Sequence, residues 1–346
     1  MTDLVDKLYK DGCLSKSEFT ELINSGDKYR EKLRALAEKL RRENYGDDIY
    51  IRGLIEFTNY CKQNCFYCGI RRDNLNCRRY RLTSDDIMSC CRQGYELGFR
   101  TFVLQGGEDA YFNDDRICEI ISAVKGKYPD CALTLSIGEK PKESYQRYFD
   151  CGADRYLLRH ETASKEHYER LHPESQRFES RIECLKSLKE IGYQVGCGFM
   201  VGSPYQSAEN LARDLLFIKE LNPQMVGIGP FIHHSDTPMR DFKDGTLEMT
   251  LLMLSIIRIM LPKVLLPATT ALATIHPRGR ELGIQAGANV VMPNLSPVSV
   301  RKEYQLYDNK VCTGEESAEC VRCLKKRVES IGCRVVVSRG DSKNNS

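Results

Sequence analysis

From residue 48 onward, short apolar runs alternate with longer stretches whose apolar residues recur every three or four positions. The short runs predict strands and the longer stretches predict helices. The predicted strands lie near residues 50–57, 101–105, 131–137, 155–160, 194–200, 225–230, 264–269 and 289–293. The predicted helices lie near residues 84–98, 115–126, 141–151, 164–170, 178–191, 207–221, 246–260 and 278–286. Glycines stand where helix C-caps are expected, at Gly98, Gly152, Gly192 and Gly287.

Eight strand–helix units, spanning about 250 residues, match a complete parallel (β/α)8 barrel, the TIM barrel. A doubly wound open sheet is the alternative, but no G-x-G-x-x-G pattern follows the first strand. A chain of two domains is less consistent, because no linker rich in Pro, Gly or Ser interrupts the alternation. We therefore expect an α/β fold with a barrel over residues 48–306.

Both ends of the chain flank this barrel. Residues 1–47 read as two or three amphipathic helices, with Leu33, Leu36, Ala37 and Leu40 at helical spacing. We expect these helices to pack on the outside of the barrel. Residues 307–346 form a polar C-terminal segment that carries cysteines, and its last residues, 340–346, predict a disordered tail.

Composition narrows the function classes. A formal net charge of +3 over 346 residues gives no reason to expect a nucleic-acid partner. Residues 1–10 alternate charged with apolar positions, unlike a secretory signal. The longest apolar run, residues 249–261, contains polar residues and is too short to span a bilayer. Sixteen cysteines in such a chain indicate reduced thiols, so we expect a cytoplasmic protein without a membrane partner.

Three cysteines follow the first predicted strand at C-x3-C-x2-C spacing: Cys61, Cys65 and Cys68. Thiolates this close on one loop can hold a soft metal centre such as an iron–sulfur cluster. Three ligands to a 4Fe–4S cluster leave one iron open to a non-protein ligand. A structural zinc site is an alternative, but it normally needs four ligands. Three unrelated reduced cysteines are another. The spacing resembles that of the radical S-adenosylmethionine (SAM) superfamily.

The end of the second predicted strand carries Gly106, Gly107 and Glu108. Paired glycines allow a ligand to lie against bare backbone, and a glutamate can accept a hydrogen bond from an ammonium group. Alone, the triplet is a weak signal and would usually be a turn with a solvated acid. Downstream of the cysteines, it resembles the superfamily motif that binds the methionine amino group of SAM.

The third and fourth strand ends also carry polar side chains. Ser136 could hydrogen-bond SAM, and Arg159, His160 and Glu161 directly follow an apolar run. Buried charge needs partners, so this cluster indicates either a ligand site or a salt bridge at the barrel rim. In the ligand interpretation, Glu161 binds the SAM ribose and Arg159 an anionic substrate group. Arg181, which opens the next helix, could bind the methionine carboxylate through two hydrogen bonds.

Residues 198–202, around Met200, resemble the superfamily G-x-I-x-G stretch whose backbone meets adenine. A buried strand could read the same way.

The stretches 225–238, 267–271 and 287–294, together with 158–162 and 304–307, resemble those of the HydE-type maturases of FeFe-hydrogenase. The resemblance covers about residues 50–325. It implies a cavity in which a small anionic or organometallic substrate is held. The residues implied are Arg159, Thr269, Thr270, Met292 and Tyr304. Without a substrate role, Thr269, Thr270 and Met292 would simply pack the barrel interior.

Cys312, Cys320 and Cys323 have C-x7-C-x2-C spacing. The same spacing binds an accessory cluster, 2Fe–2S or 4Fe–4S, in some members of this family, and other members lack it. Bare surface thiols are the alternative. His233 and His234 are interpreted as part of a polar turn, because no further metal ligand lies nearby in sequence.

Together these features predict a radical SAM enzyme that reductively cleaves SAM to a 5′-deoxyadenosyl radical. The resemblance implies action in assembly of the diiron site of FeFe-hydrogenase, with other maturation proteins and an electron donor as partners. One alternative is a radical SAM enzyme of the biotin synthase or methylornithine synthase kind, acting on a small organic substrate. Another is an iron–sulfur scaffold without turnover.

Overall fold

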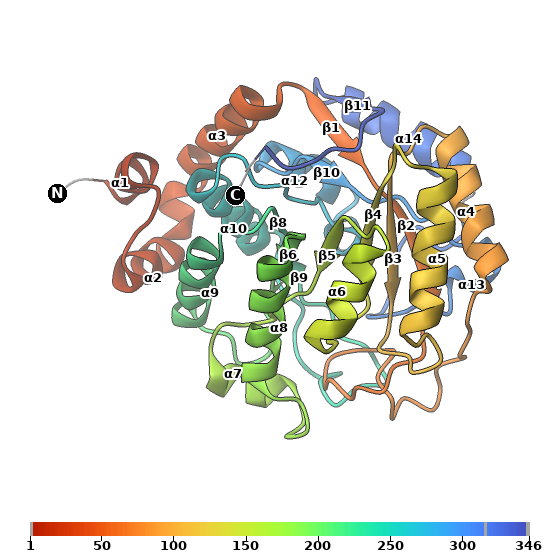
Figure 1. Cartoon of the computed structure of the whole chain (residues 1–346). Coiled ribbons are helices and arrows are strands. Elements are labelled where there is room, and N and C mark those ends of the chain that lie inside the picture. The colour runs from red at the N-terminus through yellow and green to blue at the C-terminus, as the bar shows by residue number, and fades with distance from the viewer. Residues whose placement is uncertain (1–2, 315–316, 344–346) are drawn as a thin grey trace.

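The computed structural model describes residues 3–314 and 317–343. Figure 1 shows strands at the centre of the molecule and helices around them. The strands are β1 (Asp48–Ile51), β2 (Gly53–Thr58), β3 (Thr101–Gly106), β4 (Ala132–Ser136), β5 (Arg155–Leu157), β6 (Gln194–Cys197), β7 (Met200–Val201), β8 (Met225–Val226), β9 (Gly229–Pro230), β10 (Val290–Val291) and β11 (Arg334–Val336).

Three helices precede the first strand, and the other helices are interspersed with the strands along the chain. They are α1 (Leu4–Asp11), α2 (Lys16–Asn24), α3 (Gly26–Tyr45), α4 (Ser84–Glu96), α5 (Asp114–Lys127), α6 (Lys142–Asp150), α7 (Lys165–Leu171), α8 (Phe178–Ile191), α9 (Ala208–Leu221), α10 (Leu247–Met260), α11 (Thr270–Ile275), α12 (Gly279–Gln285), α13 (Val298–Arg301) and α14 (Ser317–Glu329). Among the described residues, no helix is both long enough and apolar enough to cross a lipid bilayer.

Parallel strands form a barrel at the centre. Strands β2, β3, β4, β5, β6 and β8 pair side by side in one sheet. Isolated bridges continue the pairing from Met225 to Leu265, from Pro267 to Val290, and from Asn294 back to Leu54 in β2. Strand β7 continues the direction of β6, and strand β9 continues that of β8. Strands β7 and β9 pair with each other. The predicted α/β barrel is confirmed, with the seventh strand, near 264–269, reduced to such bridges.

The element boundaries have local causes. Thr83 and Asp86 form a capping box that begins α4, and Ser207 and Asn210 do the same for α9. All four glycines predicted as helix C-caps adopt positive φ, from 91° at Gly98 to 109° at Gly152. This left-handed conformation favours glycine, and it ends each helix before the next strand begins.

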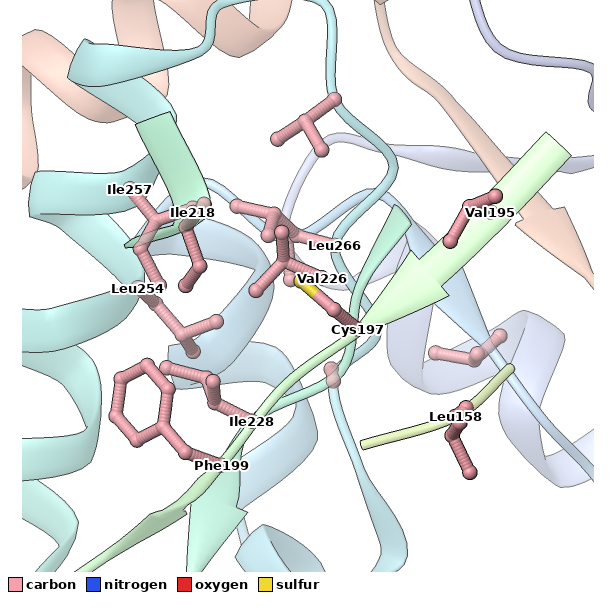
Figure 2. Packing of buried hydrophobic residues seen from close by; sticks show 14 of the residues in the cluster. Leu158, Val195, Cys197, Phe199, Ile218, Val226, Ile228, Leu254, Ile257 and Leu266 are labelled. Carbon is pink, nitrogen blue, oxygen red and sulfur yellow. The ribbon is translucent and has the colours of Figure 1, made fainter. Parts of the chain in front are cut away.

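The core lies between the strands and the surrounding helices. Figure 2 shows Cys197, Val226 and Leu266 pointing from the strands toward Ile218 of α9 and Leu254 of α10. Helix α10 is buried along almost its whole length because α3 packs against its other side. Helix α2 packs against α9 in the same way. The N-terminal helices therefore cover two barrel helices, while the division at residues 47 and 307 stays a prediction.

The predicted disordered tail is wrong for residues 340–343. Strand β11 pairs with β1, and the chain then crosses the N-terminal end of the barrel. There Arg155, which is only 2% exposed, donates to the Arg339 carbonyl (2.9 Å) and to Asp341 (2.5 Å). Gln194 also donates to Asp341 (3.0 Å). A buried guanidinium needs a counter-charge, and the tail supplies it. Residues 344–346 lie outside the described residues.

Candidate active site

The carboxyl ends of the barrel strands surround a cavity of about 330 Å³. Its wall contains every residue that the sequence interpretation assigns to the 4Fe–4S cluster at the barrel, to SAM or to the substrate, although those residues come from all parts of the barrel. They are Cys61, Cys65, Cys68, Gly106, Gly107, Glu108, Ser136, Arg159, Glu161, Arg181, Met200, Thr269, Thr270, Met292 and Tyr304. The structure thus brings these side chains together, while the role predicted for each stays a prediction.

The loop after β2 carries three thiols to this cavity. Cys61 Sγ accepts a hydrogen bond from the Glu108 backbone N–H (3.3 Å), and Cys65 Sγ accepts one from the Gln176 amide (3.4 Å). Burial raises the pKa of the Cys65 thiol to about 12. Burial, followed by the nearby Cys65 and Cys61, raises the pKa of Cys68. The three thiols are therefore so close together that a negative charge on one disfavours a negative charge on the others. Only a cationic centre would stabilise three thiolates here.

This donor set fits a 4Fe–4S cluster. Within the described ranges, no group of three or more His, Cys, Asp or Glu side chains could hold a single metal ion. A cubane does not require that arrangement, because each thiolate binds a different iron. Three soft sulfur ligands around one buried cavity suit iron–sulfur chemistry better than zinc, which would lack its fourth protein ligand.

Gly106 and Gly107 allow the end of β3 to approach the cysteine loop. A Cβ on Gly107 would lie 2.2 Å from the Tyr60 carbonyl oxygen and 2.7 Å from Cys61 Cβ. A Cβ on Gly106 would lie 2.8 Å from Thr58 Cγ2. The sequence interpretation, in which bare backbone faces a ligand, is therefore incomplete. A side chain at position 107 would push the cysteine loop away from the strand end, and one at position 106 would collide with the end of β2.

Glu108 is nearly buried and already accepts hydrogen bonds. Its Oε1 accepts from the Glu139 backbone N–H (3.0 Å) and its Oε2 from the Gln63 amide (2.8 Å). Lys62 lies 3.6 Å from the same Oε2. These contacts hold the carboxylate against the cavity wall, and a carboxylate retains lone pairs for a further donor.

Arg159 and Arg181 both have acidic neighbours. Arg159 Nη2 lies 3.2 Å from Glu161 Oε2, so the two residues form an ion pair across one wall of the cavity. Arg181 Nε lies 2.7 Å from Glu139 Oε1, and its Nη1 donates to the Arg159 carbonyl (3.4 Å). Arg181, predicted to bind a carboxylate, is therefore paired with a carboxylate of this chain.

Some polar atoms of the cavity wall are buried without a partner. Arg159 Nε and Thr269 Oγ1 make no hydrogen bond with any described residue. Arg159 Nη2, Glu161 Oε2 and Arg181 Nε lie in ion pairs but also make no hydrogen bond. Buried polar groups are normally satisfied, so a polar ligand could supply the missing partners. Thr270 Oγ1 accepts weakly from Arg280 (3.4 Å), and the Tyr304 hydroxyl accepts from Gln105 (3.4 Å).

Sequence reasoning missed an ion pair in this cavity, Glu56 with Lys310. Lys310 Nζ lies 2.5 Å from Glu56 Oε1, and the side chains are 7% and 2% exposed. Asn294 donates to the other carboxylate oxygen (2.8 Å). Glu56 could have been found, because it is the one charged residue in the apolar run 53–58. Lys310 lies in a loop and carries no such signal.

The C-terminal cysteines are not among the residues that line the cavity. Cys312 Sγ accepts from Arg280 (3.6 Å), while Cys320 is buried and Cys323 exposed on α14. Residues 315–316, between them, lie outside the described residues. An accessory cluster stays a prediction.

The predicted polar turn contains two histidines that each lie near an aspartate. His233 lies 2.7 Å from Asp244, and His234 lies 3.8 Å from Asp308.

Comparison with known proteins agrees with this geometry. Residues 55–218 match the Radical SAM superfamily. The chain is 46% identical to the FeFe-hydrogenase maturase subunit HydE of Thermotoga maritima, over 92% of both chains. It is 28% identical to 3-methylornithine synthase of Methanosarcina acetivorans, over 94% of this chain and 92% of that one. The crystal structure of methylornithine synthase superposes with a TM-score of 0.83 at 27% identity, covering 96% of this chain and 97% of that chain.

The superposition on methylornithine synthase covers nearly the whole chain, so the two proteins share the barrel and its flanking segments. The three cysteines of the cavity wall lie inside the segment that matches the superfamily. Identity of 46% over nearly full length then separates this chain from the more distant synthases. The chain belongs to the radical SAM superfamily and, within it, to the family of HydE-type FeFe-hydrogenase maturases.

Proposed function

We propose that this chain is a radical SAM enzyme that cleaves SAM reductively and acts in assembly of the diiron site of FeFe-hydrogenase. The observation that carries the proposal is the convergence of Cys61, Cys65 and Cys68 with the polar strand ends on one cavity. When bound, a 4Fe–4S cluster supplies the electron that breaks the sulfonium bond of SAM. The three cysteines would hold that cluster. The barrel would bind and orient SAM and the substrate, and it would exclude water.

We assign SAM to the part of the cavity nearest the cysteine loop. Glu108, held by the Glu139 N–H and Gln63, would accept a hydrogen bond from the methionine ammonium. The Gly106–Gly107 backbone lies beside it. Arg181 would bind the methionine carboxylate, which requires that it share or leave its contact with Glu139.

The rest of SAM would contact the segments that follow β5 and β6. Glu161 would accept from the ribose hydroxyls, and the backbone at Met200 would contact adenine. Ser136, at the end of β4, offers a further hydroxyl to the same ligand.

The substrate would occupy the remaining cavity. Arg159 Nε and Thr269 Oγ1 are buried polar atoms without partners in the described chain, which supports an anionic or organometallic substrate. Thr270, Met292 and Tyr304 would complete its walls. Other hydrogenase maturation proteins and an electron donor are the proposed partners.

We also propose an accessory cluster, 2Fe–2S or 4Fe–4S, at Cys312, Cys320 and Cys323. The Arg280 guanidinium beside Cys312 supports it, because a neighbouring cation favours a thiolate ligand.

A second candidate is a reaction on a small amino-acid substrate, since the methylornithine synthase fold covers almost the whole chain. Anaerobic reconstitution with iron counting tests the cluster, and 5′-deoxyadenosine formation under reduction tests SAM cleavage. Activation of an apo-hydrogenase with and without this chain then separates the two enzyme functions. SAM cleavage without any effect on hydrogenase activation would overturn the maturase assignment, and absence of SAM cleavage would leave only a scaffold.

A further inference from the structure

Glu161 has a backbone conformation that a residue with a side chain rarely adopts. Its φ is 64°, in the left-handed region that favours glycine. Such a conformation persists only where the surrounding structure imposes it. The Glu161 N–H donates to the Gly198 carbonyl (3.0 Å), and Glu161 bridges to Phe199 as the last contact between the fourth and fifth strands. The chain turns at this residue, and its side chain reaches the cavity wall.

His160, the preceding residue, points away from the cavity into the core and is fully buried. Its Nδ1 accepts a hydrogen bond from the Gly198 backbone N–H (3.3 Å). A nitrogen that accepts from a backbone N–H carries no proton, so the neutral ring has its proton on Nε2. Nε2 lies 3.4 Å from Asp214 Oδ1, on helix α9. The two atoms make a close polar contact without hydrogen-bond geometry.

Asp214 contacts the chain on both sides of Glu161. Its side chain is fully buried, and its Oδ1 also accepts from the Ala163 backbone N–H (2.5 Å). One carboxylate thus contacts the residue before Glu161 and the residue two positions after it. Neither His160 nor Asp214 is part of the cavity wall, so any effect of either residue on a ligand is indirect.

Two aromatic rings lie close to His160. The rings of Phe199 and Phe217 lie 5.8 and 4.8 Å from the His160 ring. Phe199 and Ile218 belong to the core shown in Figure 2. A carboxylate buried in such a core is costly unless it is paired, and apolar residues could fill the same space. A positioning role gives a reason for a polar pair at this place.

We propose that Asp214 and His160 are positioning residues that hold Glu161 in its left-handed conformation, so that its carboxylate faces SAM. This inference rests on the proposed role of Glu161 in SAM binding. Without the pair, the 159–163 segment would relax toward ordinary backbone geometry, and the Glu161 carboxylate would leave the cavity wall. The cluster cysteines lie on another segment and would keep their iron.

The test compares SAM affinity, by anaerobic calorimetry, of the reconstituted wild type, Glu161→Gln, Asp214→Asn, His160→Gln and the double variant Glu161→Gln/Asp214→Asn. Asp214→Asn and His160→Gln should each weaken SAM binding about tenfold, with unchanged iron content. The double variant should bind SAM no more weakly than Glu161→Gln alone, because the pair acts only through that side chain. Thr250→Val, equally buried on α10, is the matched control for loss of a buried polar group, and it should bind SAM normally.

The outcomes separate this inference from the assignment on which it rests. Unchanged SAM affinity in Glu161→Gln would overturn the role of Glu161 itself. A loss in Glu161→Gln, with none in the Asp214 and His160 variants, would overturn the positioning role alone. Additive losses in the double variant would do the same. Should Asp214→Asn fail to fold, His160→Gln decides the question by the same comparison, with its own double variant.

Discussion

The Arg159 guanidinium lies 3.2 Å from the Glu161 carboxylate, although the two residues have different ligands in the proposed function. The short distance alone is explained by an ion pair at the rim of the barrel. Two features go beyond that explanation. Arg159 Nε makes no hydrogen bond with any described residue, and Glu161 has a left-handed backbone conformation.

Glu161→Gln should therefore weaken SAM binding, whereas Arg159→Lys should leave it near normal and impair substrate processing. A lost charge-assisted hydrogen bond costs about 1.5–3 kcal/mol, roughly a tenfold to hundredfold change in affinity. Lysine keeps the charge of Arg159 but lacks its planar fork. Calorimetry on the two reconstituted variants, side by side, measures the difference. Equal losses of SAM affinity would favour the simple ion pair, and Arg159 would no longer be assigned to the substrate.

Cys61→Ala, Cys65→Ala and Cys68→Ala should each abolish reductive SAM cleavage and the SAM-sensitive cluster signal in electron paramagnetic resonance. Two thiolates cannot hold three irons of a cubane. Cys197→Ala, at a buried core cysteine outside the cavity wall, is the control and should keep both properties. Formation of 5′-deoxyadenosine by a variant lacking all three cysteines would contradict the whole assignment.

Replacing Cys312, Cys320 and Cys323 together by Ala should lower the iron content and leave SAM cleavage largely intact. The C-terminal cysteines are not part of the cavity wall that contains the other three. Iron counting and 5′-deoxyadenosine formation on the same preparation give both values. An unchanged iron content would favour bare thiols, and loss of SAM cleavage in a folded variant would show that the two sites are not separate.

Glu56→Gln or Lys310→Met should each lower the free energy of unfolding by about 3–5 kcal/mol, because each leaves a buried charge without its partner. The double variant should lose less than the sum of the two. Urea unfolding under anaerobic conditions measures all three. Lys142→Met breaks an exposed ion pair with Glu190 and is the control, with little expected effect. Additive losses would mean that the buried pair contributes no coupling.

His172 should make stability depend on pH. Burial, followed by the Arg181 charge, lowers the pKa of His172 from 6.5 to about 3. Between these values the unfolded chain binds a proton that the folded chain does not, so this contribution to stability is complete above about pH 6.5 and decreases as the pH falls toward 3. From pH 7.5 to 5.5, the wild type should lose about 1 kcal/mol more than His172→Gln in urea unfolding. An identical pH dependence in both proteins would place the titration elsewhere.

Local patterns in the sequence predicted the barrel and most of its cavity. Period and run length distinguish strands from helices, and glycines mark the helix ends, because both reflect conformational preferences within a few residues. The three cysteines fall within eight positions of one loop, so their meeting needs no information from elsewhere. The carboxyl ends of barrel strands gather at one face, and the resemblance to HydE-type maturases implied that Arg159, Thr269 and Tyr304 share one cavity there.

Only the tertiary structure decided which distant side chains meet. Glu56 and Lys310 are 254 positions apart, and their pairing depends on the path of the 302–314 loop across the barrel mouth. Asp341 orders residues predicted to be disordered because the buried Arg155 needs a counter-charge at the other end. Asp214 reaches both sides of Glu161 only because α9 packs against β6 and β8. The sequence by itself thus determined the elements and the chemistry that each strand end carries, since these follow from local propensity and barrel geometry. The pairing of buried charges was decided by packing between distant segments, because a charged residue in a sequence does not indicate which segment will cover it.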